Sequence, residues 1–73
     1  MEERLIRMIR DVCATDAEIT RDTNLTFDLG LMSIDLLELV TDVEDEFGID
    51  VTDEAVEGIH TVGELLDYIE SQV

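Results

Sequence analysis

The chain has 73 residues, no proline and no tryptophan, and it carries 20 acidic against 4 basic side chains, for a formal net charge of -16. A chain this short forms a single domain (residues 1–73) with one thin core and no deep active-site cavity, so a self-contained enzyme is not expected. The negative charge disfavours nucleic acid and membrane partners and favours basic protein surfaces. Because 45% of the residues are hydrophobic, the chain should fold despite its acidity.

The cysteine content and the distribution of apolar residues indicate a reducing, aqueous compartment. Cys13 has no partner for an intramolecular disulfide and cannot form a cysteine-based zinc site. No apolar run approaches the roughly 20 residues that span a bilayer, and residues 1–7 lack the apolar core of a signal peptide. We therefore expect a soluble monomer in the cytoplasm, without membrane insertion.

The first predicted element is an amphipathic helix from Glu2 to about Ala14. Its apolar residues recur at helical spacing, as Leu5, Met8, Ile9, Val12 and Cys13. From Thr15 to Met32 this periodicity is lost and turn-forming residues accumulate, which predicts a long loop of a kind that is often functional. The apolar side chains expected to hold the loop on the core are Ile19, Leu25, Phe27 and Leu29.

The clearest helical pattern runs from Ser33 to Phe47 and ends at Gly48. The stripe expected to face the core consists of Leu36, Leu39, Val40, Val43 and Phe47. A second stripe is interleaved with carboxylates and consists of Ile34, Leu37 and Thr41. This mixture suits a partner-facing surface, although a broad core face beside a solvated acidic face would give the same pattern. All four arginines lie in the first 21 residues, and 15 of the 20 acids follow them.

Two further helices complete the predicted fold. Thr52 can cap a short helix over Asp53–Gly58, and Thr61 with Glu64 forms a capping box that opens a last helix to about Ser71. The inner and flanking residues of this last helix are Leu65, Leu66, Tyr68 and Ile69. The only strand-like stretch, Phe47–Val51, is interrupted by Gly48 and Asp50. The sequence thus predicts an all-α, small four-helix bundle of three longer helices and one short helix, with a long loop between helices one and two.

No catalytic or metal-binding constellation is found in the sequence. His60, the single histidine, would have to meet Ser33 or Cys13, but its place before Thr61 is typical of a helix-entry residue. Cys13 is interpreted as a small core residue. An EF-hand with Gly48 at loop position 6 would put apolar Val43 and Phe47 at ligand positions 1 and 5. We therefore expect no catalytic residue and no specific metal site.

Ser33 is the residue that most merits a functional interpretation. It follows the loop and opens the most acidic helix, where its side chain could cap the helix by accepting a hydrogen bond from a backbone N–H. A hydroxyl at a helix start would also be exposed, and the helix dipole would favour a phosphate attached to it. The two interpretations are compatible.

The segment Asp28–Val40, with the sequence DLGLMSIDLLELV, and the following Glu44–Ile49 resemble the acyl carrier protein family. The resemblance covers essentially the whole chain. It implies that Ser33 is joined through a phosphodiester to 4′-phosphopantetheine, taken from coenzyme A by a phosphopantetheinyl transferase, and that the terminal thiol carries acyl groups as thioesters. It also implies that the chain is a carried substrate without catalysis of its own, delivered to acyl-transfer and synthase enzymes with basic docking surfaces. By position, the docking residues of the family fall on Ile34, Asp35, Glu38, Thr41, Asp42, Glu44, Asp45, Val51, Val56 and Glu57.

The chain departs from this family at Met32, where an aspartate is usual, and at Thr41, where the family often has a bulky apolar residue. Met32 could instead pack against Leu37 as a hydrophobic staple, and its presence suggests a specialised carrier. Fatty acid, lipid and polyketide biosynthesis all remain open as pathways. The alternatives are a peptidyl or aminoacyl carrier, an acidic protein-interaction module without a prosthetic group, and a hydrolase that pairs Ser33 with His60.

Overall fold

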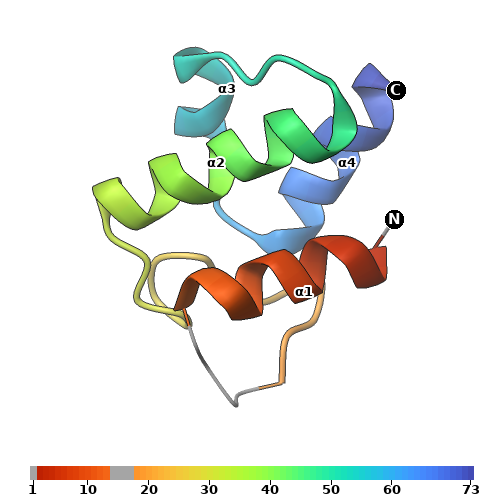
Figure 1. Cartoon of the computed structure of the whole chain (residues 1–73). Coiled ribbons are helices and arrows are strands. Elements are labelled where there is room, and N and C mark those ends of the chain that lie inside the picture. The colour runs from red at the N-terminus through yellow and green to blue at the C-terminus, as the bar shows by residue number, and fades with distance from the viewer. Residues whose placement is uncertain (1, 14–17) are drawn as a thin grey trace.

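The computed structural model describes residues 2–13 and 18–73, and of Ser33 the backbone alone. Four helices follow one another in these residues: α1 (Glu2–Cys13), α2 (Ser33–Phe47), α3 (Asp53–Gly58) and α4 (Val62–Gln72) (Figure 1). No strand occurs in these ranges, and Asn24 and Thr61 form an isolated antiparallel bridge. The predicted all-α architecture with three longer helices and one short one is confirmed. The predicted ends at Ala14 and Thr15 lie outside the described residues.

The helices begin and end at residues whose local chemistry favours those boundaries. Gly48 ends α2 with a φ of 66°, a left-handed conformation in which a Cβ atom is unfavourable. The hydroxyl of Thr52 accepts a hydrogen bond from Ala55 N at 3.1 Å and so caps α3. At the start of α4, Thr61 and Glu64 form the reciprocal capping box that their spacing predicts.

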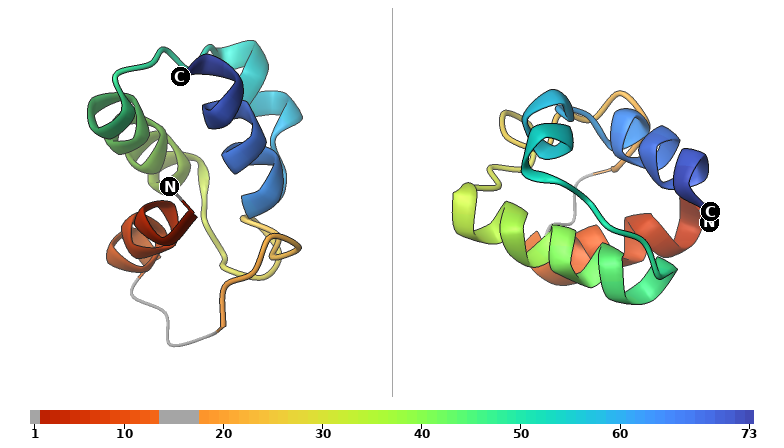
Figure 2. Two further views of the ribbon diagram at one scale, coloured as in Figure 1. Left: turned by 90° about the vertical axis from the view of Figure 1, so that its right-hand side faces the viewer. Right: turned by 90° about the horizontal axis from the view of Figure 1, so that it is seen from above.

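The core lies between α1 and α2 on one side and α4 on the other. Helix α1 packs against α2, and the side view in Figure 2 shows α4 across from both, with α3 at one edge. The buried hydrophobic side chains are Leu5, Ile9, Ile19, Leu25, Leu31, Leu39, Val40, Val43, Val51, Val62, Leu65, Leu66 and Ile69. Each fully buried leucine or isoleucine contributes about 1.5 to 3 kcal/mol relative to exposure. This core places the start of α2 at the opposite side of the molecule from the start of α1 and the end of α4 (Figure 1).

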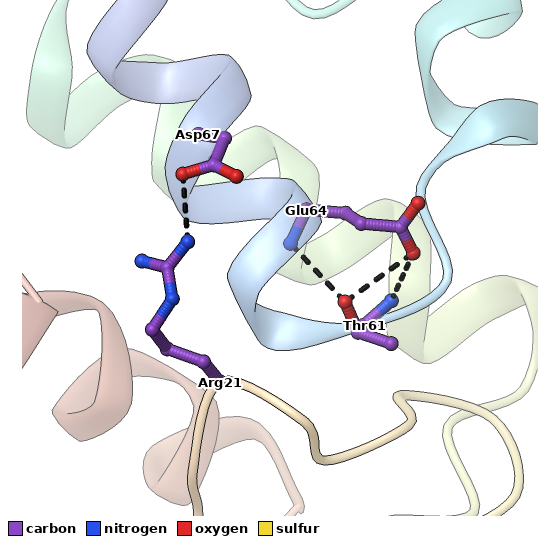
Figure 3. A network of polar contacts seen from close by, with 4 residues as sticks. All are labelled: Arg21, Thr61, Glu64 and Asp67. Carbon is purple, nitrogen blue, oxygen red and sulfur yellow. Dashed lines mark hydrogen bonds and ion pairs between the residues drawn. The ribbon is translucent and has the colours of Figure 1, made fainter.

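The loop between α1 and α2 is fastened along the start of α4. Val62 N donates to Thr23 O at 3.0 Å, and Gly63 N donates to Arg21 O at 2.8 Å. Figure 3 shows the guanidinium of Arg21 reaching Asp67, with Nη2 and Oδ1 2.8 Å apart. The hydrogen bond to Asp67 and the charge of its carboxylate raise the pKa of Arg21. The part of the loop around residues 21–23 therefore behaves as part of the folded body.

The side chains that hold this loop differ in part from those predicted. Ile19 and Leu25 are buried, and Leu29 packs against the core while partly exposed. The prediction for Phe27 is wrong, because its side chain points into solvent, and Leu31 is buried instead. The reason is a local turn: the side chain of Asn24 accepts hydrogen bonds from the backbone N–H groups of the two residues before Asp28. This turn directs Leu25 inward and the following aromatic ring outward.

Candidate functional site

Helix α2 begins without a side-chain cap. Met32 occupies the N-cap position with extended backbone angles (φ -92°, ψ 174°), and its side chain makes no cap hydrogen bond. Ser33 is the first helical residue, so its interpretation as the N-cap is corrected by one position. The first backbone bond of the helix runs from Leu36 N to Met32 O at 2.8 Å. A methionine at the cap cannot accept the N–H groups that follow it.

The amides at the start of α2 are consequently available to an external acceptor. The first N–H groups of a helix have no acceptor inside it, and no hydrogen bond within the described residues uses those of Ile34 or Asp35. Because the helix dipole places partial positive charge at this end, a phosphate group next to Ser33 would be stabilised here. The backbone at Ser33 therefore fits a phosphodiester attached at that residue.

The second apolar stripe of α2 lies on the protein surface. Ile34 is 80% exposed and Leu37 is 57% exposed, and Thr41 is exposed with its hydroxyl donating to Leu37 O at 2.9 Å. The alternative of a broad core face is therefore excluded for these three residues. The hydrophobic staple is not formed in the predicted way, since Met32 lies at the N-cap and is exposed together with Leu37.

The residues matched by position to a docking surface divide into exposed and structural members. Glu38, Asp42, Asp45 and Glu57 are exposed, and Asp35 is half-buried. The carboxylate of Glu44 accepts a hydrogen bond from Val51 N at 2.9 Å and so holds the chain after α2. Val51 itself is only 8% exposed and belongs to the core, so its side chain is not available to a partner.

Helix α3 adds its own residues beside the start of α2. Half-buried Val56 lines a groove of about 250 Å³ together with Leu36, Leu37, Asp53 and Glu57. One wall of this groove comes from α2 and the other from α3. The two helices thus place apolar side chains and carboxylates within one continuous surface.

The other end of α2 faces the arginines of α1. Arg4 Nε lies 3.2 Å from Glu46 Oε1, and Arg4 and Arg7 line a groove between the two helices together with Asp42 and Asp45. Opposite charges at this distance attract. The ion pair therefore ties the C-terminal half of α2 to α1 through Arg4 and Glu46.

The interior beneath α2 contains a very small apolar cavity. Its volume is about 10 Å³, and it is lined by Leu25, Leu36, Val40, Val56, Ile59 and Leu65. This volume is about the space of one water molecule. A long acyl chain could enter between the helices only if they moved apart.

The other residues considered for chemistry have structural positions. His60 is exposed and precedes the N-cap Thr61, where its carbonyl accepts Leu25 N at 2.9 Å. Cys13 is half-buried, with Sγ 3.0 Å from Ile9 O. In the ranges that the structure describes, no three His, Cys, Asp or Glu side chains are placed to hold a metal ion, and none of the helices found there has the length and apolar character needed to span a membrane.

The family to which the chain is related follows from sequence comparison. Residues 3–69 match the family model described as the phosphopantetheine attachment site. The acyl carrier protein of Lactobacillus acidophilus is 40% identical over 96% of this chain and 94% of its own length. That of Exiguobacterium sibiricum is 46% identical over 78% of this chain and 72% of its own.

Solved structures agree with these relatives. A protein of Mycobacterium tuberculosis that has been assigned as an acyl carrier protein superposes with a TM-score of 0.91 at 34% identity, covering 96% of this chain and 95% of that one. The acyl carrier protein of Enterococcus faecalis gives a TM-score of 0.77 at 35% identity over 100% and 99%. Both the sequence and the fold around the start of α2 thus lead to one assignment: the chain belongs to the acyl carrier protein family, whose members bear phosphopantetheine.

Proposed function

We propose that Ser33 is the residue that carries 4′-phosphopantetheine. The observation that supports this most directly is the start of α2, where the amides of Ile34 and Asp35 follow an uncapped Met32. A phosphodiester on Ser33 would supply the acceptor that these donors lack. When bound, the group supplies a thiol that holds acyl groups as thioesters.

The chain itself contributes binding and presentation rather than catalysis. Helix α2 holds the phosphate end of the arm through its backbone dipole. The carboxylates of Asp35 and Glu38, near the attachment residue, steer basic enzyme surfaces toward it. Exposed Ile34 and Leu37 then make apolar contact with the docked enzyme. A carrier needs fast association and weak binding, and steering by charge favours both.

The partners we propose are a phosphopantetheinyl transferase and acyl-transfer or synthase enzymes with basic docking surfaces. We further propose that the chain acts as a monomer in the cytoplasm and has no enzymatic activity of its own. Of the residues matched by position, the docking surface retains Ile34, Asp35, Glu38, Thr41, Asp42, Asp45, Val56 and Glu57. Glu44 and Val51 have structural roles in the segment after α2.

Modification by a transferase tests the role of Ser33. The chain is incubated with coenzyme A, Mg²⁺ and each of several carrier-protein transferases, and its intact mass is measured. We expect one phosphopantetheine adduct on the wild-type chain and none on Ser33→Ala. An unmodified wild-type chain, or an adduct that persists in Ser33→Ala, would refute the proposal. An acidic interaction module without a prosthetic group would remain unmodified by every transferase and would still bind its partner.

Ionic strength tests the proposed steering. Exposed charges are screened over about 10 Å at 0.1 M salt, so association of the modified chain with a partner enzyme should slow about tenfold or more between low and physiological salt. Stopped-flow fluorescence measures the association rate directly. The variant Glu38→Gln should show a weaker salt dependence than Glu70→Gln, an exposed acid on α4. An association rate that is indifferent to salt would contradict the steering mechanism.

A further inference from the structure

Most of the large apolar side chains that are exposed lie close to Ser33 in the sequence. Among the residues that the structure describes, five large hydrophobic side chains are exposed, and four of them lie between positions 27 and 37. Phe27 is 87% and Met32 is 74% exposed, and they join Ile34 and Leu37 of α2. Monomeric proteins rarely leave such side chains together in solvent unless the surface binds a partner.

The loop presents Phe27 in a defined position. Its backbone N–H donates to Asn24 Oδ1 at 2.8 Å, and Thr26 N donates to the same oxygen at 2.9 Å. Asp28 Oδ2 in turn accepts Asn24 N at 2.7 Å, and the neighbouring Leu25 is buried. The exposure of the ring therefore results from an ordered turn, and little conformational entropy would be lost when a partner covers it.

The loop and the start of α2 form one surface. Thr26, which directly precedes Phe27, lines a groove of about 510 Å³ together with Gly30, Leu31, Met32 and Leu36. The residues that line this groove come from both sides of Ser33 in the sequence. An enzyme that reacts at Ser33 and covers an ordinary interface area of about 800 Å² must also cover this groove and its rim.

The charges around this surface define the partner. Asp28 and Glu38 are exposed and Asp35 is half-buried, and no lysine or arginine occurs after Arg21. The complementary surface is therefore apolar at its centre and basic at its rim.

On the basis of the proposed function, we infer that Phe27 is an apolar anchor for the phosphopantetheinyl transferase. The ring inserts into an apolar pocket beside the site at which coenzyme A is held, while basic residues around that pocket meet Asp28 and Glu38. The contact with the modifying enzyme thus extends beyond α2 to the loop that precedes it. Aromatic residues that fill a pocket of the partner commonly dominate the energetics of an interface.

The test measures kcat/KM for phosphopantetheine transfer, with the transferase that modifies the wild-type chain. The variants are Phe27→Asp, Phe27→Leu and Val73→Asp, the last being an exposed apolar residue at the end of the chain, outside this surface. Both aspartate variants add the same charge, which favours a basic partner. We expect Phe27→Asp to lower kcat/KM at least about fivefold, while Phe27→Leu and Val73→Asp stay within about twofold of wild type. Thermal unfolding should be unchanged in all three, because the replaced side chains are exposed.

The outcomes separate this inference from the proposed function. Equal kcat/KM values for Phe27→Asp and Val73→Asp, with normal modification of Ser33, overturn the anchor and leave the carrier function intact. Failure of the wild-type chain to be modified by any transferase overturns the proposed function instead. Sedimentation of the wild-type chain as a dimer that Phe27→Asp converts to a monomer would show that a second copy covers the ring, which also overturns the inference.

Discussion

Helices α2 and α4 begin in opposite ways. At α4, Val62 N, Gly63 N and Glu64 N donate to the oxygen atoms of Thr23, Arg21 and Thr61, at 3.0, 2.8 and 3.1 Å. At α2, Met32 provides no side-chain acceptor, and the described residues leave the amides of Ile34 and Asp35 unused. Unsatisfied donors cost stability when no partner replaces water. One helix start thus helps to hold the fold together, while the other keeps backbone donors that no described residue uses.

The largest expected effect concerns the close contact at the start of α4. A Cβ atom added to Gly63 would lie 3.0 Å from Arg21 O, the same oxygen that accepts the hydrogen bond from Gly63 N. Gly63→Ala should therefore lower the free energy of unfolding by about 1 to 3 kcal/mol, as overpacking does. Urea denaturation followed by circular dichroism measures this change.

Gly58→Ala is the matched control for that substitution. A Cβ atom at Gly58 meets no other atom within 4 Å, so alanine should be neutral or stabilise by about 0.4 to 1 kcal/mol. If both variants were equally stable, the contact between the loop and α4 would not constrain this helix start.

A smaller loss is expected from removal of the α4 cap. Thr61→Ala leaves Glu64 N without its hydroxyl acceptor and should destabilise the chain by about 0.5 to 2 kcal/mol. Thr26→Ala is a suitable control, because Thr26 is exposed on the loop and its hydroxyl caps no helix. Thermal unfolding of the two variants distinguishes them, and equal midpoints would show that the capping box contributes little.

The smallest effect has the opposite sign and acts on α2. Met32 already has the extended backbone of an N-cap, so Met32→Asn should supply a side-chain acceptor and raise the stability by about 0.5 to 1 kcal/mol. Met32→Ala lacks an acceptor and should give no such gain. An asparagine variant no more stable than the alanine variant would mean that the start of α2 is already satisfied.

The same pair of variants should behave differently after modification. If Ser33 carries the proposed phosphodiester, the amides of Ile34 and Asp35 would have an alternative acceptor. The stabilising difference between Met32→Asn and Met32→Ala should then become smaller than in the unmodified chain. Differential scanning calorimetry of both forms measures it.

The helix boundaries that local residues specify can be predicted from the sequence. The cap at Thr52, the capping box at Thr61 and the glycine stop at Gly48 each depend on residues within four positions, and all three were predicted correctly. The exposed stripe of Ile34 and Leu37 could be recognised from its spacing, but whether it faced the core depended on what packs against α2.

The loop was harder to predict because it has no periodicity. Nothing in the spacing of the apolar residues distinguishes Phe27 from Leu31. The ring of Phe27 nevertheless lies in solvent, whereas the side chain of Leu31 is buried in the core. Asn24 would have allowed this turn to be predicted, because asparagine side chains often accept hydrogen bonds from the backbone N–H groups two and three residues further on. Val51 was placed at the surface by position, although the adjacent core buries it.

The amino-acid sequence by itself determined the number of helices, the boundaries at Gly48, Thr52 and Thr61, the acidity of the chain and its family, because these properties depend on local spacing, capping residues and composition. Only the tertiary structure decided which apolar side chains before and after Ser33 are exposed, that Arg4 of α1 pairs with Glu46 of α2, and how residues 21–23 are held along α4. These features depend on contacts between segments far apart in the chain, such as Arg21 with Asp67 and Arg4 with Glu46. The physical reason is that burial and ion pairing are set by what packs against a residue, which its sequence neighbours do not specify.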